Sequence, residues 1–342
     1  MPKLNLKLFV DDEYEFEETR LQKRKPGAKP VRKPGQAPAE VASELAEQKD
    51  VVETYEFSYR ASRHERAWIV DSLSGFYEQQ WFSDVLRLVK GGKEATVYQC
   101  LGSAPTGVRY LAAKIYRPRQ FRHLRKDHLY REGRANLDAD GNPITEDGML
   151  NAIRKRSSYG LQLAHTSWLA HEYKALQALY AAGCDVPAPY AAADNCILME
   201  YVGGDNLAAP ALNEIELERD EAQSLFARVL KNIELMLAND LVHADLSAYN
   251  ILYWQGEIKL IDFPQVIHPN HNSNAYQIFA RDVSRVCEYF ARQGVASKPR
   301  KIAAEMWTAF NHRLRPDVHP ALLDDQDERD RAYWDKLINE RG

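Results

Sequence analysis

Cysteine and long apolar runs are both scarce in this sequence. The four cysteines form no C-x-x-C pair, which argues against a disulfide framework or a zinc site and favours a reducing compartment. No stretch of about twenty apolar residues is present, so no membrane-spanning helix is expected. The first residues contain no sustained apolar run, and we expect no signal peptide. These absences predict a soluble, cytoplasmic protein that needs no membrane.

A strong excess of positive charge is also lacking. A formal net charge of −4 over 342 residues argues against a globally basic nucleic-acid binder. Basic residues are nevertheless concentrated in segments 20–33 and 117–134. Residues 1–60 are expected to form a flexible charged tail, because few large apolar side chains are available to offset the entropy of ordering it. An arm that binds RNA or another anionic partner is the alternative interpretation.

Apolar periodicity and turn residues predict the elements that follow the tail. An aromatic helix over 61–84 is expected to pack on the next domain. Residues 117–165 are strongly charged, and we expect an irregular, flexible insertion there. The other expected elements are a hairpin within 85–100, strands at 109–116 and 195–201, a helix at 166–182 capped by Thr166 or Ser167, and helices at 221–239, 275–293, 300–313 and 328–340.

Two aspartates and an asparagine in the second half of the chain have the spacing of a phosphoryl-transfer site. Asp245 lies five residues before Asn250, and Asp262 follows a predicted hairpin. Phosphoryl transfer needs a carboxylate that orients the attacking hydroxyl or accepts its proton, and it needs oxygen ligands for Mg²⁺. Asp245 suits the first role, and Asn250 and Asp262 suit the second. The hairpin would bring the two metal ligands to the same end.

A glycine turn and a strand lysine supply the groups that a nucleoside triphosphate requires. Glycine lets the backbone approach phosphate oxygens closely. Lys114, within the strand at 109–116, is the candidate cation, and Glu172 is its candidate partner because a buried lysine is costly unless paired. The predicted phosphate-binding turn comprises Gly91, Gly92, Lys93, Glu94, Ala95 and Val97.

The order of these features predicts a two-lobed, kinase-like α+β fold. The glycine turn, strand lysine, helix glutamate, His-x-Asp and second aspartate follow one another as they do in kinases. A small β-rich N-lobe would span residues 85–201, with the insertion at 117–165, and a mainly helical C-lobe would span 202–342. The strand leading to Met199, Glu200 and Val202 would connect the lobes, and its backbone would contact adenine.

Several local sequences carry a family resemblance. They are Gly-Lys-Glu-Ala-Thr-Val-Tyr (92–98), Ala-Lys-Ile-Tyr-Arg (113–117), Trp-Leu-Ala-His-Glu-Tyr (168–173), Met-Glu-Tyr-Val-Gly (199–203), His-Ala-Asp-Leu-Ser-x-Tyr-Asn (243–250), Ile-Asp-Phe-Pro-Gln (261–265) and Arg-Asp-Val (281–283). Together they resemble the RIO family of atypical serine/threonine protein kinases. That family typically has serine two positions after the catalytic aspartate, and Ser247 occupies this position here. Fewer than twenty residues separate Asp262 from Arg281, which leaves no room for a conventional activation loop.

The resemblance implies ATP and Mg²⁺, or Mn²⁺ in its place, as cofactors. Asp245 would be the catalytic carboxylate with Ser247 beside it, and Lys114, positioned by Glu172, would contact the phosphates. An aspartyl-phosphate at Asp262 has been proposed for the family, and carboxylates can act as nucleophiles toward phosphorus. The implied activity is transfer to protein serine or threonine, including autophosphorylation, or to water, as a switch in ribosome maturation. The subgroup stays open.

Two other functions remain open from the residues alone. One is a small-molecule phosphotransferase of the same broad fold, which would show a deep substrate pocket. The other is a nucleotide-gated module that binds RNA or a ribosomal particle through the basic segments, with steep salt dependence. His268 and His271 are interpreted as loop residues rather than metal ligands, and Tyr249 is expected to pack.

Overall fold

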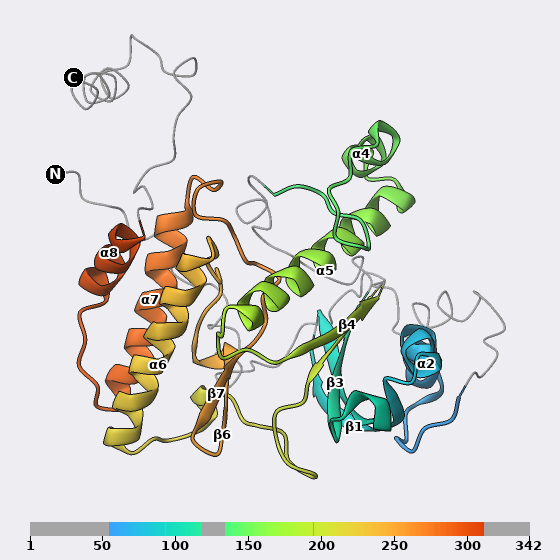
Figure 1. Ribbon diagram of the computed structural model, residues 1–342, viewed down its shortest axis with the longest axis horizontal. Helices are drawn as coiled ribbons and strands as arrows, with labels where there is room; N and C mark the ends of the chain where they lie inside the picture. Colours follow the sequence, from blue (N-terminus) through green and yellow to red (C-terminus); the bar gives the residue numbers. More distant parts are fainter. Residues whose placement is uncertain (1–54, 93, 118–133, 194, 311–342) are drawn as a thin grey trace, which may run out of the picture. The chain divides into compact units, whose positions relative to one another are not determined.

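The computed structural model describes residues 55–92, 94–117, 134–193 and 195–310 (Figure 1). Several predictions lie outside the described residues: most of the tail, all of the basic segment 20–33, most of the basic segment 117–134, Lys93 and the helix expected at 328–340. The helices are α2 (Arg63–Glu78), α4 (Asp147–Lys155), α5 (Ser158–Ala181), α6 (Arg219–Ala238), α7 (Ala275–Arg292) and α8 (Pro299–Ala309), with short 3₁₀ turns at Ala104–Thr106, Leu212–Glu214 and Ala248–Asn250. The strands are β1 (Phe82–Gly91), β2 (Ala95–Gly102), β3 (Tyr110–Tyr116), β4 (Pro189–Ala193), β5 (Cys196–Glu200), β6 (Ile251–Trp254) and β7 (Glu257–Leu260).

A five-stranded antiparallel sheet with the order β1-β2-β3-β5-β4 contains the predicted lysine. β3 is the central strand, where Lys114 pairs with Val97 of β2 and Ile197 of β5. Side chains alternate along a strand, so Lys114 faces away from its neighbours Ala113 and Ile115. Those two neighbours pack in the same buried cluster as residues of α2. Lys114 therefore lies on the other face, toward α5.

Helix α2 covers the face of the sheet opposite Lys114. It begins with a capping box, in which Ser62 and Glu65 each accept a hydrogen bond from the other's backbone N–H. The predicted packing of this helix is confirmed, since Ile69 and Leu73 are fully buried in the sheet's cluster. Its predicted extension to residue 84 is wrong. The left-handed Gln80 (φ 60°) follows the helix end at Glu78, and β1 already begins at residue 82.

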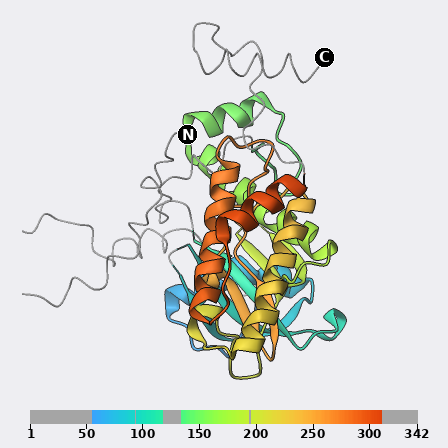
Figure 2. The same cartoon turned by 90° about the vertical axis from the view of Figure 1, so that its left-hand side faces the viewer.

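The second half of the described chain is mainly helical. Helices α6, α7 and α8 lie side by side in Figures 1 and 2. Val229, Phe290 and Trp307 bury themselves in one core that also contains Ile258 and Leu260 of the β6–β7 hairpin. The predictions for α6 and α7 are confirmed, and α8 forms up to Ala309.

The membrane and disulfide predictions can be compared with the described ranges. None of the helices there is both long and apolar enough to cross a bilayer. All four cysteines of the chain are buried and free.

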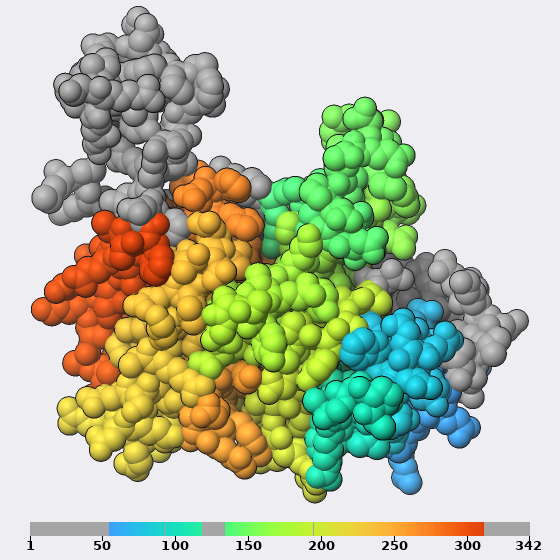
Figure 3. All heavy atoms as spheres, viewed as in Figure 1, coloured from blue at the N-terminus to red at the C-terminus, as the bar shows by residue number. Residues whose placement is uncertain are grey.

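The region between β3 and the helix bearing Glu172 is more ordered than the sequence predicts. Residues 147–155 form α4, and α5 begins at Ser158 rather than at 166 (Figure 1). The green atoms of this region project from the molecule in Figure 3. The cap is Ser157, whose side chain accepts a hydrogen bond from the Gly160 N–H. Ser167 is not a cap, because its hydroxyl accepts the Leu137 N–H from the side of the helix. The prediction of an irregular segment is thus wrong for residues 147–155 and 158–165.

Packing of α4 on the start of α5 gives a stability prediction with opposite signs at two glycines. A Cβ at Gly160 would lie 1.9 Å from the Ala152 carbonyl oxygen, whereas a Cβ at the exposed, helical Gly75 would meet nothing within 4 Å. Alanine normally stabilises a helix by about 1 kcal/mol relative to glycine. In urea denaturation, we expect Gly75→Ala to raise the free energy of unfolding by about 0.5–1 kcal/mol. Gly160→Ala should lower it by about 1–3 kcal/mol through overpacking. A stabilising Gly160→Ala would show that α4 does not pack as described.

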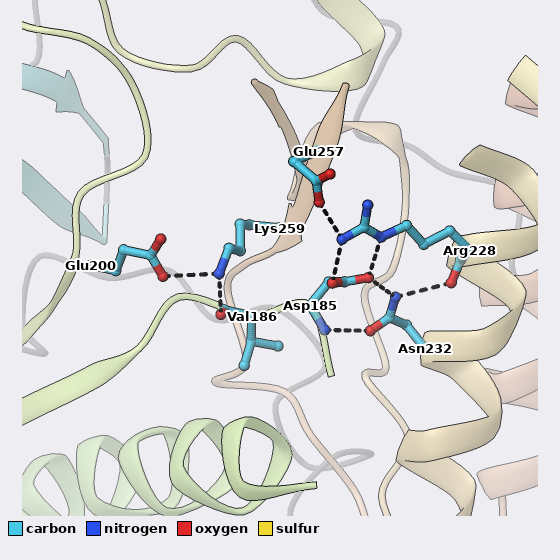
Figure 4. A network of polar contacts seen from close by, with 7 residues as sticks. All are labelled: Asp185, Val186, Glu200, Arg228, Asn232, Glu257 and Lys259. Carbon is cyan, nitrogen blue, oxygen red and sulfur yellow. Dashed lines mark hydrogen bonds and ion pairs between the residues drawn. The ribbon is translucent and has the colours of Figure 1, made fainter. Parts of the chain in front are cut away.

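A polar network joins the sheet to the helical half next to the connector (Figure 4). Asp185, in the loop after α5, accepts two hydrogen bonds from Arg228 of α6 at 2.7 and 2.8 Å and one from Asn232 at 2.7 Å. On β7, Lys259 donates to the Glu200 carboxylate at 2.9 Å and to the Val186 carbonyl at 3.2 Å. Since the Asp185 carbonyl also accepts the Leu260 N–H at 2.7 Å, the loop after α5 is fixed to both α6 and the hairpin.

Candidate active site

Lys114 brings together two acidic residues that are far apart in the sequence. Its Nζ lies 2.8 Å from Glu172 Oε1 on α5 and 2.7 Å from Asp262 Oδ1 after β7. Only 13% of the lysine side chain and 4% of the Glu172 side chain are exposed, whereas 42% of Asp262 is exposed. The predicted pairing of Lys114 with Glu172 is therefore present, and Asp262 is the open member of the trio.

Burial and charge act in opposite directions on this trio. Burial alone would lower the pKa of Lys114, but the carboxylates of Asp262 and Glu172 outweigh it and raise that pKa well above its ordinary value. Burial would likewise raise the pKa of Asp262, and the facing Lys114 ammonium lowers it below its ordinary value instead. Lys114 and Asp262 are thus both charged at neutral pH. Tyr116 completes the arrangement, because its hydroxyl donates to the second oxygen of Glu172.

The β6–β7 hairpin positions Asn250 and Asp262 as predicted. Ile251 pairs with Leu260, and the Ile261 N–H donates to the Asn250 carbonyl at 2.9 Å, which extends the ladder by one residue. Asn250 thus lies across from the residue directly before Asp262. Asp262 itself has a left-handed backbone with φ 72°. This conformation costs a non-glycine residue about 1 kcal/mol, so the surrounding structure must hold it.

Asp245 is held by groups from two elements. Asn250 donates from Nδ2 to the Asp245 carbonyl at 2.9 Å and to its Oδ2 at 3.3 Å, and Arg285 of α7 lies 3.1 Å from Oδ1. Half of the side chain remains exposed. Burial raises the pKa of Asp245, and although His243 and Arg285 oppose this, the nearby carboxylates of Asp282 and Asp262 add to it. The pKa of this carboxyl is therefore above its ordinary value, which favours a proton acceptor.

The loop around Asp245 is held mainly through its backbone groups, by one backbone hydrogen bond and by side chains of Arg281 and His243. Ser247 uses its carbonyl to accept the Asn250 N–H at 3.0 Å, which forms the 3₁₀ turn that carries Asn250. Arg281 of α7 donates to the carbonyl of the left-handed Ala244. His243 accepts the Asp245 N–H at Nδ1 and lies 3.1 Å from the Ile261 carbonyl through Nε2. The prediction that Tyr249 packs is wrong, because 47% of it is exposed on this short turn.

The predicted phosphate-binding turn joins β1 to β2 beside Lys114. The Gly92 N–H donates to the Ala95 carbonyl at 2.9 Å, and a Cβ at Gly92 would lie at the same distance from that oxygen, which is too close. Gly91 ends β1, and the Glu94 carbonyl accepts the Arg117 N–H at 2.8 Å. Val97 pairs directly with Lys114. Lys93 lies outside the described residues.

The predicted adenine connector already uses some of its backbone groups. The Glu200 N–H donates to the Ala188 carbonyl at 2.8 Å, and the Val202 carbonyl accepts the Ala209 N–H at 3.0 Å. Met199 is half-buried and packs against the main core. The Glu200 N–H and the Val202 carbonyl are therefore already occupied, and an adenine contact at this connector would use other backbone groups.

Three contributors to the site were not predicted from the sequence. Tyr116 and Arg285 each bind a predicted residue through the side chain, and Lys90 on β1 helps to lower the pKa of Asp262. Tyr116 and Lys114 share one face of β3, so alternation along the strand was the available signal. Arg285 is one helical turn beyond Arg281, a spacing that indicates the same side of α7.

The donor set fits a magnesium ion bound together with a nucleotide. Asn250 uses its amide nitrogen on Asp245, which leaves its amide oxygen for a ligand, and Asp262 offers a half-exposed carboxylate. Mg²⁺ commonly binds through one or two protein oxygens and the phosphates of its substrate rather than through a complete protein cage. The described ranges contain no group of three or more His, Cys, Asp or Glu residues able to hold a metal. His268 and His271 lie in the loop between β7 and α7, as predicted.

Comparison with known proteins establishes the family. A family model described as "RIO domain" matches residues 96–302. The chain belongs to the RIO-domain family. The match includes Lys114, Glu172, Asp245, Asn250 and Asp262, so the predicted resemblance and the kinase-like α+β fold are both confirmed.

Curated relatives of this RIO-domain chain include two archaeal proteins. It is 32% identical over 209 residues to the RIO-type serine/threonine-protein kinase Rio1 of Haloferax volcanii, covering 60% of this chain and 63% of that protein. It is 32% identical over 135 residues to the protein of the same name from Thermoplasma acidophilum, covering 40% and 69%. The human serine/threonine-protein kinase RIO1 is 30% identical over 131 residues, or 38% of this chain and 23% of the human one. The chain therefore spans less than two thirds of the first of these relatives and under a quarter of the last.

Among solved structures, the Rio2 kinase-ADP/Mg²⁺-phosphoaspartate complex from Chaetomium thermophilum has a TM-score of 0.48 and 20% identity. The similarity covers 79% of this chain and 74% of that one.

Proposed function

We propose that this RIO-domain chain transfers the γ-phosphoryl group of ATP to a protein serine or threonine hydroxyl, with water as a slower acceptor. The observation that carries the proposal is the contact of Lys114 with both Glu172 and Asp262, next to a half-exposed Asp245. A cation for phosphates, a carboxylate for a metal and a carboxylate for a hydroxyl are the groups that phosphoryl transfer requires. The relatives named as serine/threonine-protein kinases support the same acceptor class.

Each residue has a defined task in this proposal. Asp245 orients the acceptor hydroxyl and takes its proton as the oxygen attacks phosphorus and the bond to ADP breaks. Lys114, held by Glu172, exchanges Asp262 for phosphate oxygens, so that Asp262 and the Asn250 amide oxygen become available to Mg²⁺ or Mn²⁺. The metal supplies neutralisation of charge on the phosphates when it is bound. Ser247 keeps Asn250 in place through the turn that it closes.

The nucleotide would lie between the turn at 91–95 and the connector. Backbone groups of Gly91, Gly92, Lys93, Glu94 and Ala95 contact the phosphates, Val97 lines the adenine, and the connector at 199–202 binds its edge. We further propose 85–201 as the N-lobe and 202–342 as the C-lobe. A cytoplasmic location stays a prediction.

The acceptor and the partners follow from the same proposal. We expect autophosphorylation, and a protein or ribosomal particle as the physiological partner. Of the basic segment 117–134 only Arg117 and Arg134 are described, and Arg134 is turned toward backbone carbonyls rather than toward a ligand. Contact with RNA would therefore rest on the remaining residues of the two basic segments.

The proposal is tested with γ-labelled ATP, Mg²⁺ and the purified chain without added substrate. We expect label on the protein together with released phosphate, and a loss of both by about 10²–10⁴-fold in Asp245→Asn, because this is the usual contribution of a general base. Glu234→Ala, which removes an exposed carboxylate on α6, is the control and should retain the wild-type rate. Transfer to a metabolite but not to protein would favour the small-molecule phosphotransferase. ATP binding without any transfer would favour a nucleotide-gated scaffold.

A further inference from the structure

Residues 134–146, the first described residues of the insertion after the gap at 118–133, lie across α5 and are called the strap (Figure 1). Leu137 is buried, and its N–H donates to Ser167 Oγ at 2.8 Å. The Ile144 N–H donates to the Asn136 carbonyl at 2.8 Å, which folds the strap back on itself. Lys174 of α5 donates to the Gly141 carbonyl. The strap is thus a built part of the domain, anchored along the helix that carries Glu172.

The first residue of the strap reaches the segment directly after Asp262. Arg134 donates from Nη1 and Nη2 to the Pro264 carbonyl, each at 3.2 Å, and from Nη2 to the Val266 carbonyl at 3.1 Å. A planar guanidinium suits two neighbouring carbonyls, because its donors point in fixed directions. Arg134 is half-buried, although its neighbours in the sequence suggested a solvated basic run.

A second contact fixes the strap beside Glu172. His171 Nε2 lies 2.7 Å from the Ala135 carbonyl. Burial and the nearby charge of Arg134 lower the pKa of His171 to about 4, so at neutral pH the neutral ring donates this hydrogen bond. Arg134 and Ala135 therefore connect the segment after Asp262 to the residue that precedes Glu172.

The segment held by Arg134 directly follows Asp262. Asp262 has its left-handed backbone between two fixed stretches, with Ile261 bonded to Asn250 on one side. On the other side the Val266 N–H donates to the Phe263 carbonyl at 3.2 Å, which forms a turn that begins directly after Asp262. Val242 and Ile267 then exchange two hydrogen bonds at 2.9 and 3.0 Å. The carbonyls of Pro264 and Val266, which Arg134 binds, lie within and at the end of this turn.

We propose that Arg134 is a positioning residue, which holds the turn after Asp262 and thereby orients the Asp262 carboxylate toward the metal. The insertion then contributes to the reaction itself, besides any contact with partners, because Arg134 at the start of the strap sets the orientation of a metal ligand. This inference rests on the proposed function, since it assigns Asp262 to a metal bound with a nucleotide. Residues that orient a metal ligand without touching the metal typically change metal affinity by about 10–100-fold when they are replaced.

The experiment measures how strongly Mg²⁺ and ADP promote each other's binding to the full chain. ADP affinity is determined by calorimetry in EDTA and over a series of Mg²⁺ concentrations, and the ratio of the two limits gives the coupling factor. In Arg134→Met we expect ADP affinity in EDTA to stay within about twofold of wild type and the coupling factor to fall about tenfold. Arg134→Lys, which keeps the charge and can reach one carbonyl, should recover part of the coupling.

The matched control is Arg154→Met, which removes a positive charge from an exposed position on α4 in the same insertion. It should leave the coupling factor unchanged. A coupling factor within about twofold of wild type in Arg134→Met, or an equal fall in Arg154→Met, overturns the positioning role while the proposed function stands. If Arg134→Met weakens ADP binding by the same factor in EDTA as in the presence of Mg²⁺, Arg134 has a general structural role. That result also overturns the positioning role. Absence of any Mg²⁺ effect on wild-type ADP binding would refute the metal site itself, and the inference with it.

Discussion

Asp262→Asn should reduce Mg²⁺-dependent phosphoryl transfer at least about a hundredfold, because a neutral amide replaces the charged metal ligand. The backbone should be maintained, since asparagine tolerates the left-handed conformation that Asp262 adopts at φ 72°. Lys114 keeps Glu172 as its partner in the variant, so the fold should not be lost. The measurement is the initial rate of labelling and of phosphate release from γ-labelled ATP.

The chemistry of the label distinguishes two roles for Asp262. If Asp262 acts only as a metal ligand, the label on the protein is acid-stable phosphoserine or phosphothreonine, and Asp262→Asn reduces its amount. If Asp262 also accepts the phosphoryl group, wild-type protein carries label that hydroxylamine removes, and the variant lacks this fraction. Asp205→Asn is the matched control, because Asp205 pairs with Arg109 at 2.8 Å but on the exposed surface. A wild-type rate in Asp262→Asn would exclude this carboxylate from the reaction.

Lys114→Met should have the largest combined effect on activity and stability. The substitution removes the cation from a Glu172 side chain of which 4% is exposed, and leaves this anion with the Tyr116 hydroxyl. Removing one partner of a buried ion pair lowers the free energy of unfolding by about 3–5 kcal/mol, because the remaining charge is uncompensated. We expect a fall of this size in the free energy of unfolding from urea denaturation, together with a loss of transfer of at least about a hundredfold.

A double variant separates the two effects. Lys114→Met with Glu172→Leu removes both charges, so more than half of the lost stability should return while activity stays absent. Lys301→Met, from an exposed pair with Glu305 at 3.5 Å, should change the free energy of unfolding by less than about 1 kcal/mol. If Lys114→Met is as stable as wild type, the trio described around this lysine is not formed in solution.

The face of β3 that carries Lys114 and the β6–β7 hairpin could be predicted because each depends on local sequence. Strand alternation places Lys114 on one face of β3, and the short turn at Gln255–Gly256 brings Asn250 and Asp262 to one end. Both are consequences of backbone geometry within a few residues. The family resemblance then assigned these groups to a common site, although the residues lie far apart along the chain.

The strap and the start of α5 could not be predicted in the same way. Ser157 and Ser167 are equally good caps by residue type, and only the packing of α4 on α5 decides between them. Arg134 belongs to a run of arginines and lysines, which charge patterning alone assigns to solvent. Its contacts with Pro264 and Val266 depend on tertiary structure across more than a hundred residues.

The fixed loop after α5 defines a pivot point for any tilt of this helix. The loop at Asp185 is hydrogen-bonded to α6 and β7, so a tilt of α5 would pivot about its C-terminal end. At 1.5 Å per residue, Glu172 lies about 14 Å from Ala181 and Ser158 about 35 Å from it. A tilt of the helix therefore displaces its far end, where α4 packs, more than twice as far as it displaces Glu172. For such a tilt, Glu172 moves by less than half the distance that the α4 end moves.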